Sequence, residues 1–137
     1  MINVAVVGMG WWGKIIVPQL RRNPKISVNT VVEVNPASIT AFAQEHDVRV
    51  VDNLNAVLQD PAIEGVVLCT PHTLHTDQII AAANAGKHVF CEKPLSMTRE
   101  AVLRAVKAVN DNKRVLAVGH ERRFEPPILE AMRIVAS

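Results

Sequence analysis

The chain of 137 residues lacks several features that would place it in a specialised class of protein. No apolar run approaches the roughly 20 residues that a membrane-spanning helix needs. The net charge of +2 is too small to favour binding to nucleic acid or to an anionic membrane surface. No basic segment precedes the first apolar run, so we expect no signal peptide and a cytoplasmic location.

Cysteine is also scarce, because the chain contains only Cys69 and Cys91. Each lies in an apolar run that predicts a buried strand, which favours two free thiols in a reducing compartment over a disulfide. Cys69 begins a Cys-x-x-His-x-x-His spacing, completed by His72 and His75, that superficially suits zinc. Since Cys69 is expected within a strand and only three ligands are present, we predict no metal site.

Strand and helix patterns alternate along the whole chain, without internal repeats, low-complexity segments or linkers. This alternation predicts parallel strands joined by crossover helices. We therefore expect an α/β Rossmann fold, a doubly wound and mostly parallel sheet of six strands in the order 3-2-1-4-5-6, with helices on both faces. The predicted strands cover residues 1–7, 26–34, 48–51, 65–70, 88–91 and 115–118, and the predicted helices cover residues 11–22, 37–46, 54–59, 73–85, 99–111 and 127–136.

The first turn of this pattern carries the most informative motif, GMGWWG at residues 8–13. Its three glycines have the spacing of the dinucleotide fingerprint, and they follow a strand and open a helix as that fingerprint requires. Gly8 allows the tight turn, Gly10 lets a pyrophosphate approach the backbone, and Gly13 lets the helix pack on the sheet. The free N–H groups at the helix start attract phosphate. The motif therefore predicts a dinucleotide site.

A second landmark of the fingerprint is an acidic residue about 20 positions after the glycines, which binds the adenosine ribose. Asn35 stands at this distance, at the predicted end of the second strand. An uncharged residue there would not repel a 2′-phosphate, so the cofactor stays undecided between NAD and NADP. Glu33 is the other candidate, but strand alternation directs it away from the strand tip, where it would be a polar residue on a sheet face.

Unusual residues gather at the predicted carboxyl ends of the strands, which share one rim of the sheet and bind ligands in this fold. The fourth strand ends in TPHTLH at residues 70–75, the fifth in EKP at residues 92–94, and the sixth in GHERRF at residues 119–124. The residue before Pro94 is forced into an extended backbone, and we consider a cis bond between Lys93 and Pro94. These segments predict the walls of the site.

With these motifs, the chain resembles the N-terminal domain of the Gfo/Idh/MocA oxidoreductases, the family of glucose-fructose oxidoreductase and inositol dehydrogenase. The matching segments are the GMGWWG loop, VVLCTPHTLHTDQIIAAANAGKHVFCEKPLSMT and VGHERRFEPPI, and together they span essentially the whole chain. The resemblance implies transfer of hydride between NAD or NADP and a polyol, sugar or inositol-like substrate. It leaves open a non-catalytic sensing or regulatory module, and more weakly a stand-alone nucleotide-binding module.

The resemblance also implies a role for each site residue. The catalytic residue would be Lys93, whose ammonium would polarise or position a substrate oxygen, while His75 would lie near the nicotinamide half of the cofactor. The residues that the resemblance places around the cofactor are Gly8, Gly10, Trp11, Trp12, Gly13, Asn35, Thr70, Pro71, His75, Glu92 and Lys93.

The resemblance further divides the chain into an NAD(P)-binding Rossmann domain at residues 1–120 and the start of a crossover at residues 121–137. In the family this crossover leads into a second α+β domain, which supplies most of the substrate pocket and a catalytic histidine and is expected to lie outside this chain. Activity of the chain alone is therefore uncertain, although cofactor binding is expected. Apolar surface that faces such a domain would favour self-association, which makes a homo-oligomer a possible state.

Overall fold

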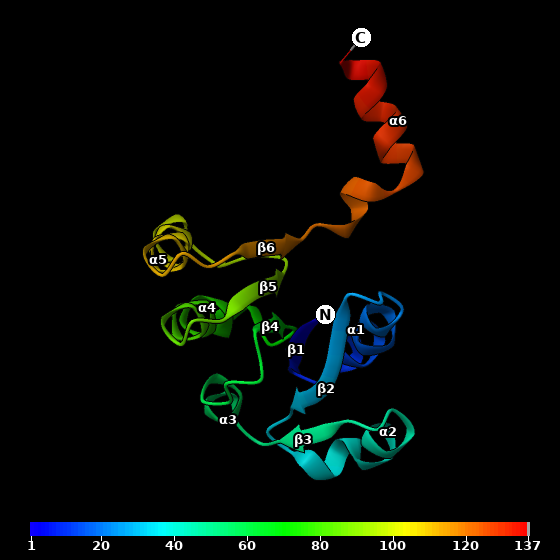
Figure 1. The fold of residues 1–137 in the computed structure, drawn as a ribbon. Helices are drawn as coiled ribbons and strands as arrows, with labels where there is room; N and C mark the ends of the chain where they lie inside the picture. Colours follow the sequence, from blue (N-terminus) through cyan, green and yellow to red (C-terminus); the bar gives the residue numbers. More distant parts are fainter. Residues whose placement is uncertain (137) are drawn as a thin grey trace.

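Six parallel strands form a single twisted sheet in the order β3-β2-β1-β4-β5-β6 (Figure 1). The computed structural model describes residues 1–136. This order confirms the doubly wound Rossmann fold. The topological switch point, where the strand order changes direction, lies between β1 and β4. The strands are β1 (Ile2–Val7), β2 (Ile26–Val32), β3 (Arg49–Val51), β4 (Gly65–Leu68), β5 (His88–Glu92) and β6 (Leu116–Gly119).

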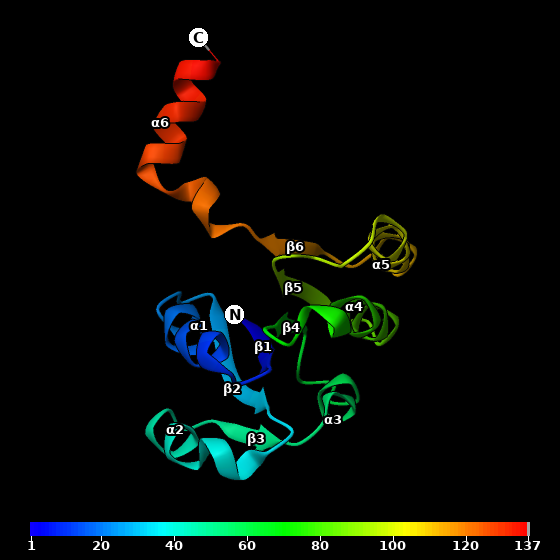
Figure 2. The ribbon, with the colours of Figure 1, turned by 180° about the vertical axis from the view of Figure 1, so that it is seen from behind.

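Helices cover both faces of the sheet, as Figures 1 and 2 show from opposite sides. One face carries α1 (Trp11–Arg21) and α2 (Thr40–Glu45), and the other carries α3 (Leu54–Leu58), α4 (His75–Asn84) and α5 (Arg99–Asp111). Short 3₁₀ turns precede or interrupt the helices at η1 (Pro36–Ile39), η2 (His72–Leu74) and η3 (Glu121–Phe124), and the last helix is α6 (Pro126–Val135). Each connection returns the chain to the same end of the sheet, so the loops after the strands gather at one rim.

The sequence predicted two of these helices as longer than they are. The segment 37–46 begins as η1, because the Asn35 carbonyl accepts hydrogen bonds from the N–H and the hydroxyl of Ser38. The segment 73–85 likewise begins as η2, and α4 starts only at His75. Two helix ends carry recognisable end signals. Thr98 caps α5 by accepting from the Ala101 N–H, and Gly86 follows α4 with a φ of +75°.

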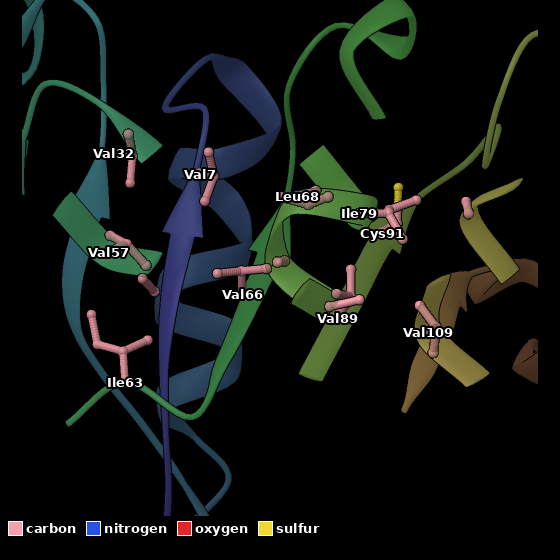
Figure 3. Packing of buried hydrophobic residues seen from close by; sticks show 14 residues of the cluster. Val7, Val32, Val57, Ile63, Val66, Leu68, Ile79, Val89, Cys91 and Val109 are labelled. Carbon is pink, nitrogen blue, oxygen red and sulfur yellow. The ribbon is translucent and has the colours of Figure 1, made fainter. Parts of the chain in front are cut away.

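The core consists of two apolar layers, one on each face of the sheet. Alternate residues of the central strands enter opposite layers, which explains why β1 and β4 are nearly continuous apolar runs. In the layer drawn in Figure 3, Leu68 and Val89 from the sheet meet Ile79 of α4 and Val109 of α5. Burial of each such side chain contributes about 1.5–3 kcal/mol. The layers therefore fix the strand ends that carry the site.

The last helix, α6, extends away from the sheet in Figures 1 and 2. Its residues Ile128, Leu129 and Met132 are each at least 40% exposed, so the described part of the chain leaves an apolar helix face uncovered. Self-association through such a surface stays a prediction. Within residues 1–136, none of the helices has the length and hydropathy that crossing a membrane requires.

Candidate functional site

The glycine loop joins β1 to α1, and its three glycines have different surroundings. Gly8 has a φ of +90°, and an added Cβ would lie 2.9 Å from the Cys69 carbonyl. A Cβ on Gly13 would lie 2.1 Å from the Gly8 carbonyl oxygen. Around Gly10, in contrast, no heavy atom lies within 4 Å of such a Cβ. The loop is therefore packed on the protein side at Gly8 and Gly13 and open at Gly10, where a phosphate can approach the backbone.

The start of α1 is suited to an anion. Gly10 is the N-cap, no side chain caps the helix, and its first turn contains no acidic residue. The N–H groups of the first turn and the positive end of the helix dipole are thus available to a ligand. Of the two tryptophans in this turn, Trp11 is 77% exposed, whereas Trp12 is partly buried with its indole N–H enclosed.

Two cavities lie along the rim on either side of β4, and both touch Cys69 and Thr70. The first cavity, of about 570 Å³, lies over the ends of β1 and β2; its other walls include Gly8, Met9, Gly10, Glu33, Val34, Asn53, Leu54, Pro71, Leu74 and Gln78. The second cavity, of about 410 Å³, lies toward β5; its other walls are Trp11, Trp12, His72, Glu92, Lys93, Glu121 and Arg122. The two cavities are therefore neighbours along the rim and share the wall formed by Cys69 and Thr70.

Glu33 lies in the wall of the first cavity, which corrects the prediction that it points away from the strand tip. Its carboxylate accepts hydrogen bonds from the Met9 N–H at 3.2 Å and from the Asn35 N–H at 3.1 Å. The prediction was wrong because β2 ends at Val32, so strand alternation no longer directs the Glu33 side chain. Asn35 is exposed beyond the cavity, and its carbonyl holds the turn of η1.

His75 is completely buried beneath the rim and is a wall residue of neither cavity. The two nitrogens of its ring lie 2.9 Å from the carbonyl oxygens of Thr70 and Pro94. The sequence placed His75 near the nicotinamide half of a cofactor, and the structure instead places it between the backbone segments that form the rim. Thr70 and Pro71 themselves lie in the wall of the first cavity.

Glu92 and Lys93 at the end of β5 both face the second cavity. Glu92 is only 9% exposed and packs so closely on Gly119 that an added Cβ there would lie 2.7 Å from the carboxylate. Lys93 is exposed, and it forms no ion pair with the described residues 1–136. The bond between Lys93 and Pro94 is cis, as considered from the sequence. The lysine therefore presents a free ammonium beside the second cavity.

The sequence missed several wall residues because they belong to no recognised motif. Asn53 caps α3 and Gln78 lies on α4; the sequence assigned no role to Asn53 and placed Gln78 only in a helix. His72 and Arg122, in contrast, lie in the strand-end segments 70–75 and 119–124 that the sequence predicted as walls of the site, and both border the second cavity. Their proximity is a consequence of the strand order, which brings distant segments to one rim.

Both thiols are free, and their surroundings make them unreactive. Burial first, and the negative charge of Glu92 next, raises the pKa of Cys91 to about 12. The same two causes, followed by the nearby Cys91, raise the pKa of Cys69 to about 12. Among residues 1–136, no three histidine, cysteine, aspartate or glutamate side chains come together as metal ligands. The Cys69, His72 and His75 side chains are therefore not assembled as the zinc spacing would require.

The Cys91 thiol makes a testable contribution to stability at alkaline pH. In the unfolded chain the thiol ionises near pH 9.0, whereas in the folded chain it stays protonated to about 12. Above pH 9 the unfolded state binds fewer protons, so the free energy of unfolding falls as pH rises. Between pH 8 and pH 10, the free energy of unfolding of wild type should fall by about 1 kcal/mol more than that of a Cys91→Ala variant, which urea unfolding at both pH values would measure. Parallel losses in the two proteins would contradict this assignment.

Comparison with known proteins agrees with this geometry. The family described as "Oxidoreductase family, NAD-binding Rossmann fold" matches residues 2–120. An uncharacterized oxidoreductase, YrbE, of Bacillus subtilis is 31% identical over 98% of this chain and 40% of its own length. An inositol 2-dehydrogenase of Rhizobium meliloti is 33% identical over 98% of this chain and 40% of its own length. The chain thus spans about two fifths of the length of these curated relatives.

The similarity extends to solved structures. The scyllo-inositol dehydrogenase of Lactobacillus casei, solved with bound NAD(H) and scyllo-inositol, superposes with a TM-score of 0.91 at 28% identity. The match covers 99% of this chain and 41% of that structure. The shared part is the dinucleotide-binding fold, and the names of these relatives favour an oxidoreductase over the regulatory alternative that the sequence left open.

Proposed function

This chain belongs to the Gfo/Idh/MocA oxidoreductase family, as its NAD-binding Rossmann domain, and from that premise we propose that it binds NAD in preference to NADP. The observation that carries the proposal is the position of Glu33. Its carboxylate stands in the wall of the first cavity and is anchored to the glycine loop through the Met9 N–H. A carboxylate there accepts hydrogen bonds from ribose hydroxyls and repels a 2′-phosphate.

The lining of the two cavities supports this proposal. The adenosine half would occupy the first cavity beside Glu33, and the pyrophosphate would meet Gly10 and the N–H groups at the start of α1. The nicotinamide half would occupy the second cavity, against Trp12 and Thr70. In this placement the cofactor lies across the carboxyl ends of the strands at the topological switch point between β1 and β4, where this fold binds its ligands.

We propose that the whole protein oxidises a CH–OH group of a polyol, sugar or inositol-like substrate to a carbonyl, or reduces that carbonyl in the reverse direction. When bound, the nicotinamide supplies the hydride acceptor or donor. Lys93 would donate a hydrogen bond from its ammonium to the reacting oxygen, which orients the substrate and stabilises negative charge developing on that oxygen. Its position at the edge of the second cavity, without an ion-pair partner among residues 1–136, supports this role.

We also propose that residues 121–137 begin the crossover into a second α+β domain. The extended position of α6 and its exposed apolar face support this boundary. Substrate selection would then depend on residues of that domain as well as on Glu121 and Arg122 beside Lys93. The chain described here would accordingly bind cofactor, and the complete reaction would require the longer protein.

Calorimetric titration with NADH tests the proposal. We expect saturable binding by the wild-type chain and at least a tenfold loss of affinity in a Gly10→Leu variant, because the side chain would occupy the approach of the pyrophosphate. The open space around Gly10 means that this variant should fold normally, which circular dichroism and urea unfolding would check. Equal NADH affinity in the two folded proteins would refute the placement of the cofactor.

A further inference from the structure

Glu92 is a buried carboxylate at the end of β5 that faces the second cavity. Its side chain is 9% exposed, and its oxygens lie over Gly119 of β6, where the absence of a side chain leaves room for them. Phe90, two residues earlier in β5, packs in the same core layer as Val17 of α1. Because strand residues two apart share one face of the sheet, Glu92 also projects toward α1, whose Trp12 forms another part of the cavity wall.

The Glu92 carboxylate has no partner within the described residues. Among residues 1–136, no donor bonds to it and it forms no ion pair, while the Cys91 thiol donates only to the backbone carbonyl of Glu92. In this part of the chain, the enclosed side-chain polar atom without a partner is the indole nitrogen of Trp12, so the unpartnered Glu92 oxygens must open to the cavity. Burying a carboxylate without a donor costs free energy, and this opening limits the cost because water in the cavity can reach the oxygens.

A ligand that fills the second cavity displaces this water and must replace the interactions that it supplied. The group that we place in this cavity is the nicotinamide, and its two redox forms differ in charge. The oxidised ring carries a positive charge, which is lost when a hydride is transferred to the ring. Of the two forms, only the oxidised ring therefore attracts the buried carboxylate as a cation, and this attraction is strong where the surroundings contain little water.

We propose that Glu92 is a specificity-determining residue that stabilises the oxidised, cationic ring of the cofactor relative to the reduced, neutral ring. This role rests on the proposed function, which assigns the nicotinamide half to the second cavity. Bound NADH would be a stronger hydride donor than it would be without the carboxylate. Each tenfold gain in preference for the oxidised form lowers the reduction potential of this two-electron couple by about 30 mV.

The other charged or titratable side chains of this cavity wall are exposed. Lys93 and Arg122 oppose a cationic ring and Glu121 favours it, but these three side chains and that of His72 all lie in contact with solvent. Water and salt screen exposed charges much more than they screen a charge that is buried as Glu92 is. Glu92 is therefore the charge in this wall that distinguishes the two forms of the ring most strongly.

Calorimetric titration with NAD⁺ and NADH tests this role through the ratio of the two dissociation constants. We expect Glu92→Gln and Glu92→Met to shift the ratio toward NADH by about tenfold relative to wild type, since both remove the charge and keep a similar volume. A contact that either variant loses to the ribose or to the cavity wall would weaken both forms alike and leave the ratio unchanged. Glu100→Gln, at an exposed position of α5, also removes one negative charge and is the matched control, which should keep the wild-type ratio.

The outcomes separate this role from the proposed function. A shift of less than threefold in a folded Glu92 variant, or an equal shift in Glu100→Gln, would overturn the role of Glu92 while leaving cofactor binding in place. Absence of binding of both forms by the wild-type chain would refute the proposed function and the role of Glu92 with it. Glu92→Met replaces a buried, unpartnered charge by an apolar group and should fold at least as well as wild type, so it decides the question if Glu92→Gln does not fold.

Discussion

A Gly13→Ala variant is expected to lose at least about 3 kcal/mol of folding free energy, a large part of the 5–15 kcal/mol typical of a domain. The reason is the contact between α1 and the glycine loop, where the new Cβ would lie 2.1 Å from the Gly8 carbonyl oxygen. Backbone atoms occupy this space, so no side-chain rotation can relieve the overlap. In an ordinary helix the same substitution would stabilise by about 1 kcal/mol, which makes the sign of the effect informative.

Urea unfolding of Gly13→Ala and Gly10→Ala provides the measurement and its control. Gly10 is the N-cap, and an added Cβ there meets no heavy atom within 4 Å. Gly10→Ala should therefore lose only about 1 kcal/mol, the usual effect of alanine at an N-cap. A stability loss in Gly13→Ala no larger than that in Gly10→Ala would show that α1 can move away from the loop, against the packing described above.

The fold was predictable from the sequence because its signals are local and repeated. Each buried strand is a short apolar run, each helix has an apolar face, and turn residues such as Gly86 and Thr98 mark the ends. The strand order then followed from the alternation of strands and helices. The glycine loop could also be placed, since Gly8, Gly10 and Gly13 have distinct backbone roles within six residues.

The site was less predictable, because its walls depend on where each strand ends. Because β2 ends at Val32 and not two residues later, Glu33 and not Asn35 lies in the wall of the first cavity as the candidate ribose-binding residue. Periodicity does not fix element ends to within two residues, so a sequence cannot decide this exchange. The burial of His75 could not be predicted from the sequence either, because its two carbonyl partners come from the segments after β4 and β5, which only the folded sheet brings together.

The second large effect concerns the choice of cofactor. We expect the wild-type chain to bind NADH at least tenfold more tightly than NADPH, and a Glu33→Gln variant to lose most of this preference. The carboxylate that favours ribose hydroxyls also repels a 2′-phosphate, and a charged hydrogen bond contributes about 1.5–3 kcal/mol. Glutamine retains an oxygen that can accept from the Met9 N–H, so the glycine loop should keep its anchor.

Titrations of both cofactors against Glu33→Gln and Asn35→Ala decide between the two candidate ribose residues. Asn35 donates to the Glu33 carboxylate through its backbone N–H and accepts from Ser38 of η1 through its carbonyl, and alanine preserves both contacts. If Glu33 selects the cofactor, Asn35→Ala should discriminate between NADH and NADPH as wild type does. A loss of NADH affinity in Asn35→Ala but not in Glu33→Gln would restore the sequence-based assignment. The Glu33 charge lies in the cavity wall, where salt screens it less than it screens an exposed charge. The difference in cofactor preference between wild type and Glu33→Gln should therefore persist at high salt.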